Sequence, residues 1–126
     1  MKMRTFRDLQ VWQRSMKLAI EIYAVTKAFP KEELFGLTSQ LRRAAVSIPS
    51  NIAEGYGRDT EKVFALFVNQ ARGSLYEVET QIELCRSLGL LNPRQSDQVL
   101  ANAAEIGRMM HGLIRKLRAS SLTASR

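Results

Sequence analysis

Residues 93–119 read PRQSDQVLANAAEIGRMMHGLIRKLRA, and the spacing of their apolar side chains indicates one long amphipathic helix. These side chains recur at alternating steps of four and three residues: Val99, Ala103, Ile106, Met110, Leu113 and Leu117. Such steps are typical of the seam between the helices of a bundle. Asn92 is placed to cap the helix, with Pro93 at its first position. The fold class predicted from this stretch is therefore an all-α bundle.

Three further stretches upstream show the same periodicity. The first predicted helix runs from about Asp8 to Ala28, and Phe29-Pro30 ends it because the residue before proline avoids helical geometry. Its apolar stripe is Leu9, Trp12, Met16, Ala19, Tyr23 and Thr26. The second runs from about Leu37 to Tyr56, and Pro49 inside it predicts a kink or a restart of the helix. The third opens at Asp59 or Thr60 and ends at Gly89.

Short connections make consecutive helices antiparallel. We therefore predict an antiparallel up-down-up-down four-helix bundle, with its second helix kinked at Pro49. The bundle domain is expected to cover residues 1–119. Residues 120–126 are small and polar and are expected to form a flexible C-terminal tail.

Two helices carry more apolar residues than one bundle stripe needs. The additional positions are Val11, Leu18, Ile22 and Val25 in the first helix and Leu100, Ala104, Gly107 and Ile114 in the fourth. Surplus apolar surface is often buried against another molecule, so we predict self-association. The oligomer interface is expected at Val11, Leu18, Ile22, Val25, Leu100, Ala104 and Ile114. The alternative is a broad core face within one chain.

The 126-residue chain has a net charge of +7, which favours polyanionic partners such as RNA or DNA. Its single cysteine and the lack of an apolar leader favour a cytoplasmic protein. Apolar runs are too short to span a membrane, so no membrane partner is expected.

The positive charge is concentrated near the two ends of the sequence. Residues 1–17 and 94–126 each carry a net charge of +4, whereas residues 18–93 carry −1. In the predicted topology both chain ends and the turn between the second and third helices lie at one pole. We predict phosphate binding there, with little base selectivity, by these residues: Arg7, Arg14, Lys17, Arg42, Arg58, Arg115, Lys116 and Arg118. The alternative for the last three is a stabilising interaction with the helix dipole.

No pattern typical of catalysis or of a bound metal or cofactor occurs. His111 has no acid or thiol one helical turn away, and Cys85 falls on an apolar stripe. Glu77, Glu79 and Glu83 are interpreted as a solvated helix face. We therefore expect a protein that is not an enzyme and that has no catalytic residue, metal site or cofactor.

One segment is distinctive: residues 42–58 read RRAAVSIPSNIAEGYGR. Together with FRDLQVW at 6–12, ELFGLTSQLRRA at 33–44 and ARGSLYEVETQIE at 71–83, it resembles the four-helix-bundle proteins of large-subunit rRNA intervening sequences. The resemblance covers about Phe6 to Ala119. It implies a pentameric barrel around a positively charged pore. It also implies similarity to accessory proteins of diversity-generating retroelements, which bind a reverse transcriptase and nucleic acid.

Three functions remain open at this point. The first is a homo-oligomer, pentameric by resemblance, that binds nucleic acid non-specifically through a basic pore or rim. The second is a scaffold for a reverse transcriptase-like partner, and the third is a remnant of a mobile element or rRNA insertion. Arg43 is expected to have a structural role, bonding Glu54 or carbonyls near Pro49, whereas Arg42 is expected to face solvent or a pore.

Overall fold

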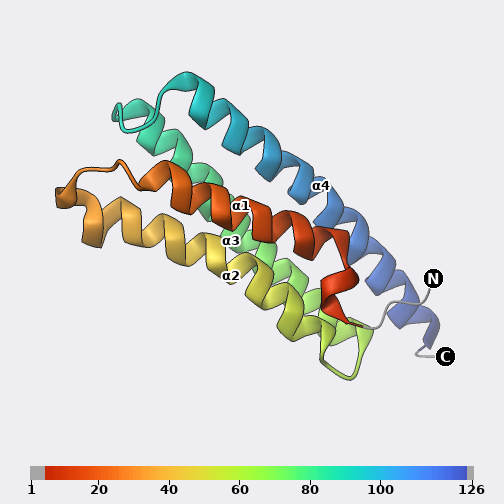
Figure 1. Cartoon of the computed structure of the whole chain (residues 1–126). Helices are drawn as coiled ribbons and strands as arrows, with labels where there is room; N and C mark the ends of the chain where they lie inside the picture. Colours follow the sequence, from red (N-terminus) through yellow and green to blue (C-terminus); the bar gives the residue numbers. More distant parts are fainter. Residues whose placement is uncertain (1–4, 125–126) are drawn as a thin grey trace.

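The computed structural model describes residues 5–124, which form four long helices in an antiparallel bundle (Figure 1). The helices are α1 (Gln10–Thr26), α2 (Ser39–Tyr56), α3 (Glu61–Ser87) and α4 (Pro93–Ala124). Three short elements accompany them: the 3-10 turns η1 (Phe6–Asp8) and η2 (Lys31–Glu33) and the π-helical turn η3 (Leu34–Thr38). Each helix packs against the next, and α1 also packs against α4. The described residues contain no strand, so the predicted all-α fold is confirmed.

Polar side chains fix the starts of the later helices. The Thr60 hydroxyl accepts a hydrogen bond from the Val63 amide at 3.1 Å and caps α3. Asn92 and Gln95 form a reciprocal capping box at the start of α4, with distances of 2.8 and 3.1 Å. Gly89 has a φ of 77°, and its left-handed geometry lets the chain turn between α3 and α4. The predicted start of α4 at Pro93 is therefore correct.

Helix α2 passes through Pro49 as one continuous element and does not restart there. The Ser47 hydroxyl donates to the Ala44 carbonyl, and the Ser50 hydroxyl donates to the Val46 carbonyl, both at 2.8 Å. These bonds occupy carbonyls next to the position where proline removes a backbone donor. Pro49 itself is buried in the core.

The buried face of α1 differs from the predicted stripe. Met16 and Tyr23 of that stripe are exposed, whereas Leu18 and Ile22 are fully buried. Ser15 and Thr26 share the core with them, because each hydroxyl donates to the carbonyl four residues earlier. Leu9, Ala19 and Thr26 of the predicted stripe are buried as expected, so the stripe is correct in part. Ser15 was missed because a satisfied hydroxyl can occupy a core position.

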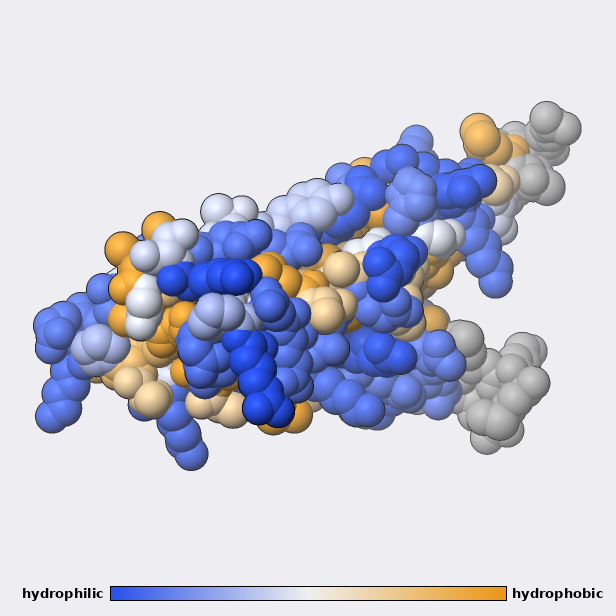
Figure 2. Space-filling model, turned by 90° about the horizontal axis from the view of Figure 1, so that it is seen from above, coloured by the Kyte–Doolittle hydropathy of each residue, from blue (hydrophilic) through white to orange (hydrophobic). Residues whose placement is uncertain are grey.

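The predicted oligomer interface is wrong at four positions. Val11, Leu18, Ile22 and Ile114 lie inside the core of a single chain and offer no surface to a second copy. Val25, Leu100 and Ala104 are half-buried against that core or beside it. The broad core face, which was the alternative, accounts for these residues. Surplus apolar surface exists elsewhere, because the mainly hydrophilic surface in Figure 2 is interrupted by hydrophobic residues. Among the large hydrophobic side chains of residues 5–124, Phe35 is the most exposed, at 90%.

The expected flexible tail at 120–126 is not observed over its described part. Helix α4 continues past Ala119 to Ala124, and residues 125–126 lie outside the described part of the chain. Neither glycine nor proline follows Ala119, so nothing in this part of the sequence stops the helix. As a result, α4 projects beyond the other helices (Figure 1).

Candidate nucleic-acid interface

One pole of the bundle brings together three parts of the chain that are distant in sequence. Element η1, the turn between α2 and α3, and the C-terminal part of α4 all lie at this end, next to both termini (Figure 1). Lys62 at the start of α3 and Arg118 near the end of α4 line one groove of about 360 Å³. The predicted juxtaposition therefore exists, and we call this end the terminal pole.

Helix α4 supplies the free cations of the terminal pole. Arg115, Lys116 and Arg118 are exposed, and none forms an ion pair with a carboxylate of residues 5–124. Because α4 runs on to Ala124, all three precede its last turn. Helix-dipole stabilisation falls off within that last turn, so it does not explain this cluster.

The arginines on the other two parts of the pole are already engaged. Arg58 pairs with Glu54 at 2.9 Å, and its guanidinium lies 5.0 Å from the centre of the Phe67 ring. The Arg7 guanidinium lies 4.5 Å from the centre of the Phe6 ring. Lys2 and Arg4, two further cations that the sequence predicts at this pole, fall outside the described residues.

Acidic residues also surround the turn between α2 and α3. Asp59 and Glu61 are exposed beside it, close in sequence to the Arg58–Glu54 pair. These carboxylates offset the positive charge of Arg58 and Lys62. The positive field of the pole is therefore concentrated on α4.

Arg14 and Lys17 lie apart from the terminal pole, along a groove between α1 and α4. Glu21 shares this groove and accepts a hydrogen bond from the Asn102 amide at 2.9 Å. Nearby, a hydrogen bond from Arg108 lowers the pKa of Glu105, and the charge of Arg14 lowers it further. Carboxylates thus alternate with the cations on this side.

Arg42 corrects one of the predicted binding residues. Its Nε donates to the Thr26 hydroxyl at 2.9 Å, and its Nη2 donates to the Tyr23 carbonyl at 3.4 Å. The guanidinium also stacks 4.5 Å from the centre of the Tyr23 ring. Arg42 therefore fastens the start of α2 to the end of α1, where helix carbonyls lack backbone partners.

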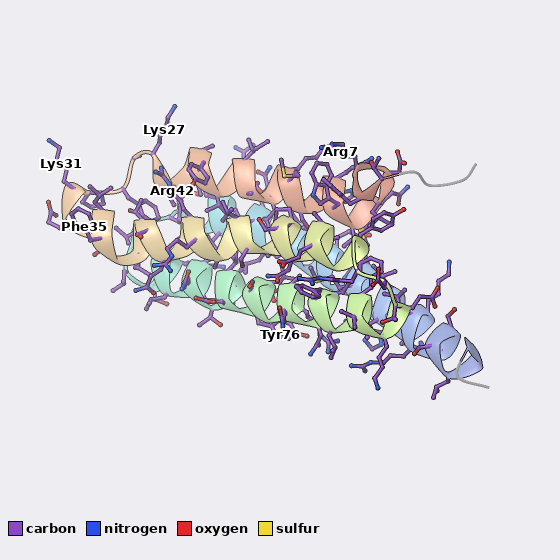
Figure 3. All side chains as sticks on the ribbon, turned by 90° about the horizontal axis from the view of Figure 1, so that it is seen from below. Arg7, Lys27, Lys31, Phe35, Arg42 and Tyr76 are labelled. Atoms are coloured by element: carbon purple, nitrogen blue, oxygen red, sulfur yellow. The ribbon has the colours of Figure 1, made fainter. Side chains whose placement is uncertain are left out.

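The structural role predicted for Arg43 is also wrong. Its side chain is exposed, and Glu54, the expected partner, pairs with Arg58. Consecutive helix positions point about 100° apart, so one arginine faces α1 and the next faces solvent. Figure 3 shows Arg42 beside α1, far along the bundle from Arg7.

The match to known proteins covers most of the bundle. The model of the 23S rRNA-intervening sequence protein family matches residues 7–112. The chain belongs to this family. The resemblance carried by the sequence around residues 42–58 is thus confirmed. The family match stops before Arg115, Lys116 and Arg118, so the free cations of α4 lie beyond it.

A solved structure shows the same fold. It is the crystal structure of a protein of unknown function from the S23 ribosomal protein family of Bacteroides thetaiotaomicron. The TM-score is 0.75 at 22% sequence identity, and the alignment covers 82% of this chain and 97% of that chain. No curated protein matches the sequence.

Residues considered for chemistry lie in ordinary environments. Cys85 is fully buried, and burial, with a smaller contribution from Glu33, raises its pKa to about 11. Partial burial raises the pKa of Glu79, and the nearby negative charge of Glu83 raises it further by a smaller amount. His111 is exposed in a groove beside α3, and no group of three histidine, cysteine or acidic side chains gathers within residues 5–124. In the same range no helix is both long and apolar enough to cross a bilayer.

Two surfaces were missed by the sequence analysis. Leu122 is exposed and lines the groove with Lys62 and Arg118, but it falls in the segment expected to be a flexible tail. Phe35 is exposed in η3, where Gly36 has a ψ of −116° and interrupts helical geometry. The FG pair at 35–36 before the second helix was a signal of such a break.

Proposed function

We propose that the chain forms a homo-oligomer that binds nucleic-acid phosphates through the cations at the end of α4. The supporting observation is the set of exposed side chains Arg115, Lys116 and Arg118, which pair with no carboxylate in the described part of the chain. They need not release a carboxylate partner before they contact phosphate. Neutralised phosphates release bound counterions, which supplies affinity without reading the bases.

Repetition of this cluster strengthens the proposal. In a ring of parallel subunits, each copy would add one α4 end to a common basic rim. Family resemblance implies five copies, so a rim would carry many cations at short spacing. Because such contacts are with the backbone, we expect little preference among sequences.

A salt titration with matched variants tests the proposal. We would measure binding of one RNA and one DNA duplex, each in two unrelated sequences, by fluorescence anisotropy. Replacing Arg115, Lys116 and Arg118 by Ala should weaken binding equally for all sequences. The slope of log K against log salt should fall by about 0.9 for each DNA phosphate that the variant no longer neutralises.

The control removes the same charge elsewhere. The control variant replaces Lys27, Lys31 and Arg94 by Ala, three exposed cations that lie away from the terminal pole. Each triple variant loses three positive charges, so the two have the same net charge. The control variant should retain the slope of the wild type. Equal weakening by both triple variants would reject a binding site at the terminal pole and would attribute the affinity to net charge alone. A wild-type affinity that does not change with salt would reject phosphate binding.

A protein partner at the same pole is the second candidate. Leu66 and Leu122 are exposed in the groove that Lys62 and Arg118 line, and apolar surface beside charge is common in protein interfaces. A reverse transcriptase-like protein would then bind directly. Co-purification with such a protein that survives nuclease treatment, and is abolished in Leu122→Glu, would support this function over the first.

A further inference from the structure

A groove between α1 and α2 is apolar, positively charged and open. Tyr23, Phe35, Arg42, Arg43 and Val46 are among the residues that line its volume of about 620 Å³, and no carboxylate lines it. The buried hydroxyl of Thr38 also borders it and has no hydrogen-bond partner among the described residues. A group that fits here should bring apolar side chains and negative charge. We call this surface the α1–α2 groove.

The outward face of α3 has that composition. Tyr76, Thr80 and Leu84 are spaced one helical turn apart, and Glu77 and Glu83 are exposed beside them. Tyr76 is 55% exposed and Leu84 is 46% exposed. Figure 3 shows Tyr76 on the outer side of α3, away from Arg42 and Phe35. We call this surface the α3 face.

We propose that the α1–α2 groove of one copy binds the α3 face of the next copy. The proposal rests on the homo-oligomer of the proposed function and names its contact. Phe35 and Val46 would pack against Tyr76 and Leu84. Arg43, whose guanidinium is exposed, would face Glu77 and Glu83. Opposite charges across such a contact fix its register and disfavour other pairings.

The two surfaces lie at the same height along the bundle. The Gln81 side-chain amide donates to the Gln40 side-chain oxygen at 3.3 Å, so this part of α3 is level with the start of α2. The α3 face begins at Tyr76 and ends at Leu84, and the α1–α2 groove includes residues from Phe35 to Val46. Subunits related by rotation about an axis parallel to their helices meet at equal height. Both surfaces satisfy this condition.

The contact is between two different surfaces of the same chain. A contact of this kind is heterologous, so it repeats around a ring or along a filament rather than stopping at a dimer. It would also leave the cations of α4 uncovered, because none of them lines the α1–α2 groove. Assembly and phosphate binding can therefore occur together.

Charge reversal with rescue tests the contact. We would measure the mass of each variant by light scattering at several concentrations. Arg43→Glu should dissociate the assembly or weaken it more than tenfold, since it places like charges in contact. Glu77→Lys with Glu83→Lys in one chain should do the same. Combining all three changes in one chain should restore the wild-type mass.

Each alternative gives a different result. Arg94→Glu is a control because it reverses an exposed charge outside both surfaces, and its mass should equal that of the wild type. If Arg43→Glu keeps the wild-type mass and loses only nucleic-acid binding, the groove holds nucleic acid and the proposal is wrong. Dissociation without rescue would show that the two surfaces do not meet. A monomeric wild type would instead overturn the homo-oligomer itself. Thermal unfolding by circular dichroism confirms that each variant is folded.

Discussion

At the terminal pole Arg115, Lys116 and Arg118 extend from α4 without a carboxylate partner in residues 5–124, whereas near the opposite end Arg42 is held between two helices. All four residues have the same kind of charge and all occur in helices. The difference lies in what the neighbouring helix offers. At Arg42 the end of α1 presents a carbonyl, a hydroxyl and an aromatic ring. The neighbouring elements offer the α4 cations no such groups: their side chains are exposed, and none pairs with a carboxylate of residues 5–124.

This comparison separates two uses of arginine. An arginine that satisfies the carbonyls of a helix end contributes to folding, and its removal should lower stability. An arginine that faces only water contributes little to folding and remains available for a ligand. Stability measurements on matched variants can therefore assign each cation to one use.

The largest effect is expected from packing near the terminal pole. A Cβ atom on Gly55 would lie 2.4 Å from the Cβ atom of Phe67, so α2 and α3 would have to move apart. We expect Gly55→Ala to lower the free energy of unfolding by about 3 kcal/mol, as in other overpacked cores. Urea denaturation measures it. If this variant is as stable as the wild type, the close approach of the two helices is wrong.

Gly73 supplies the control for that variant. It lies in α3, and nothing lies within 4 Å of its Cβ position. Gly73→Ala should raise the free energy of unfolding by about 0.5–1 kcal/mol, because alanine favours the helix. Opposite signs at the two glycines would show that packing, rather than the removal of glycine, determines the cost.

The next effect tests the comparison directly. Arg42→Ala should lower the free energy of unfolding by about 2 kcal/mol, because it removes two hydrogen bonds and the stacking of the guanidinium on the Tyr23 ring. Arg43→Ala and Arg115→Ala should each change it by less than about 0.5 kcal/mol. Chemical denaturation of all three variants gives the ranking. Equal losses of stability at Arg42 and Arg43 would break the distinction between held and free arginines.

A smaller effect is expected at the helix caps, and it should be similar at both ends of the bundle. Thr60→Ala at the terminal pole and Asn92→Ala at the opposite end each remove a side-chain cap. Each should cost about 1 kcal/mol in thermal or urea unfolding. Thr60→Ser should retain most of the stability. A large difference between the two ends would indicate that one end unfolds separately.

The smallest effect is expected at the exposed pair of Arg58 and Glu54. Both side chains are about half exposed. Glu54 lies in the last turn of α2, and Arg58 follows the end of that helix. A double-mutant cycle with alanine should give a coupling of about 0.3–0.5 kcal/mol that decreases in salt. A coupling above about 1 kcal/mol would place Arg58 with Arg42 among the held arginines.

Much of the fold followed from local patterns. Asn92-Pro93 fixed the start of α4, and the four-three steps from Val99 to Leu117 identified its seam. The α1 face was assigned only in part: Leu9, Ala19 and Thr26 are buried as predicted, whereas Met16 and Tyr23 are exposed. Ser15 was missed because its bond to the carbonyl four residues earlier does not show in an apolar pattern. Val11, Leu18 and Ile22, which were assigned to an oligomer interface, belong to the buried face of α1.

The candidate site was predictable only in part. Charge counts placed cations at the ends of the chain, and the topology brought those ends together. Charge counts did not show that Arg58 would form an ion pair with Glu54 or that Arg42 would donate a hydrogen bond to Thr26. The Arg58–Glu54 pair follows the local spacing of one helical turn, whereas the Arg42–Thr26 bond depends on the distance between α1 and α2, which composition does not give.

The sequence by itself determined that four amphipathic helices form, where most of them begin and end, and which family the chain belongs to. Those properties depend on neighbours within a few residues: helical spacing, caps and breakers. The tertiary structure alone decided which of two adjacent arginines is bound and which is free, and which apolar residues remain exposed. Each of those outcomes depends on the side chains of another helix, which are far away in the sequence.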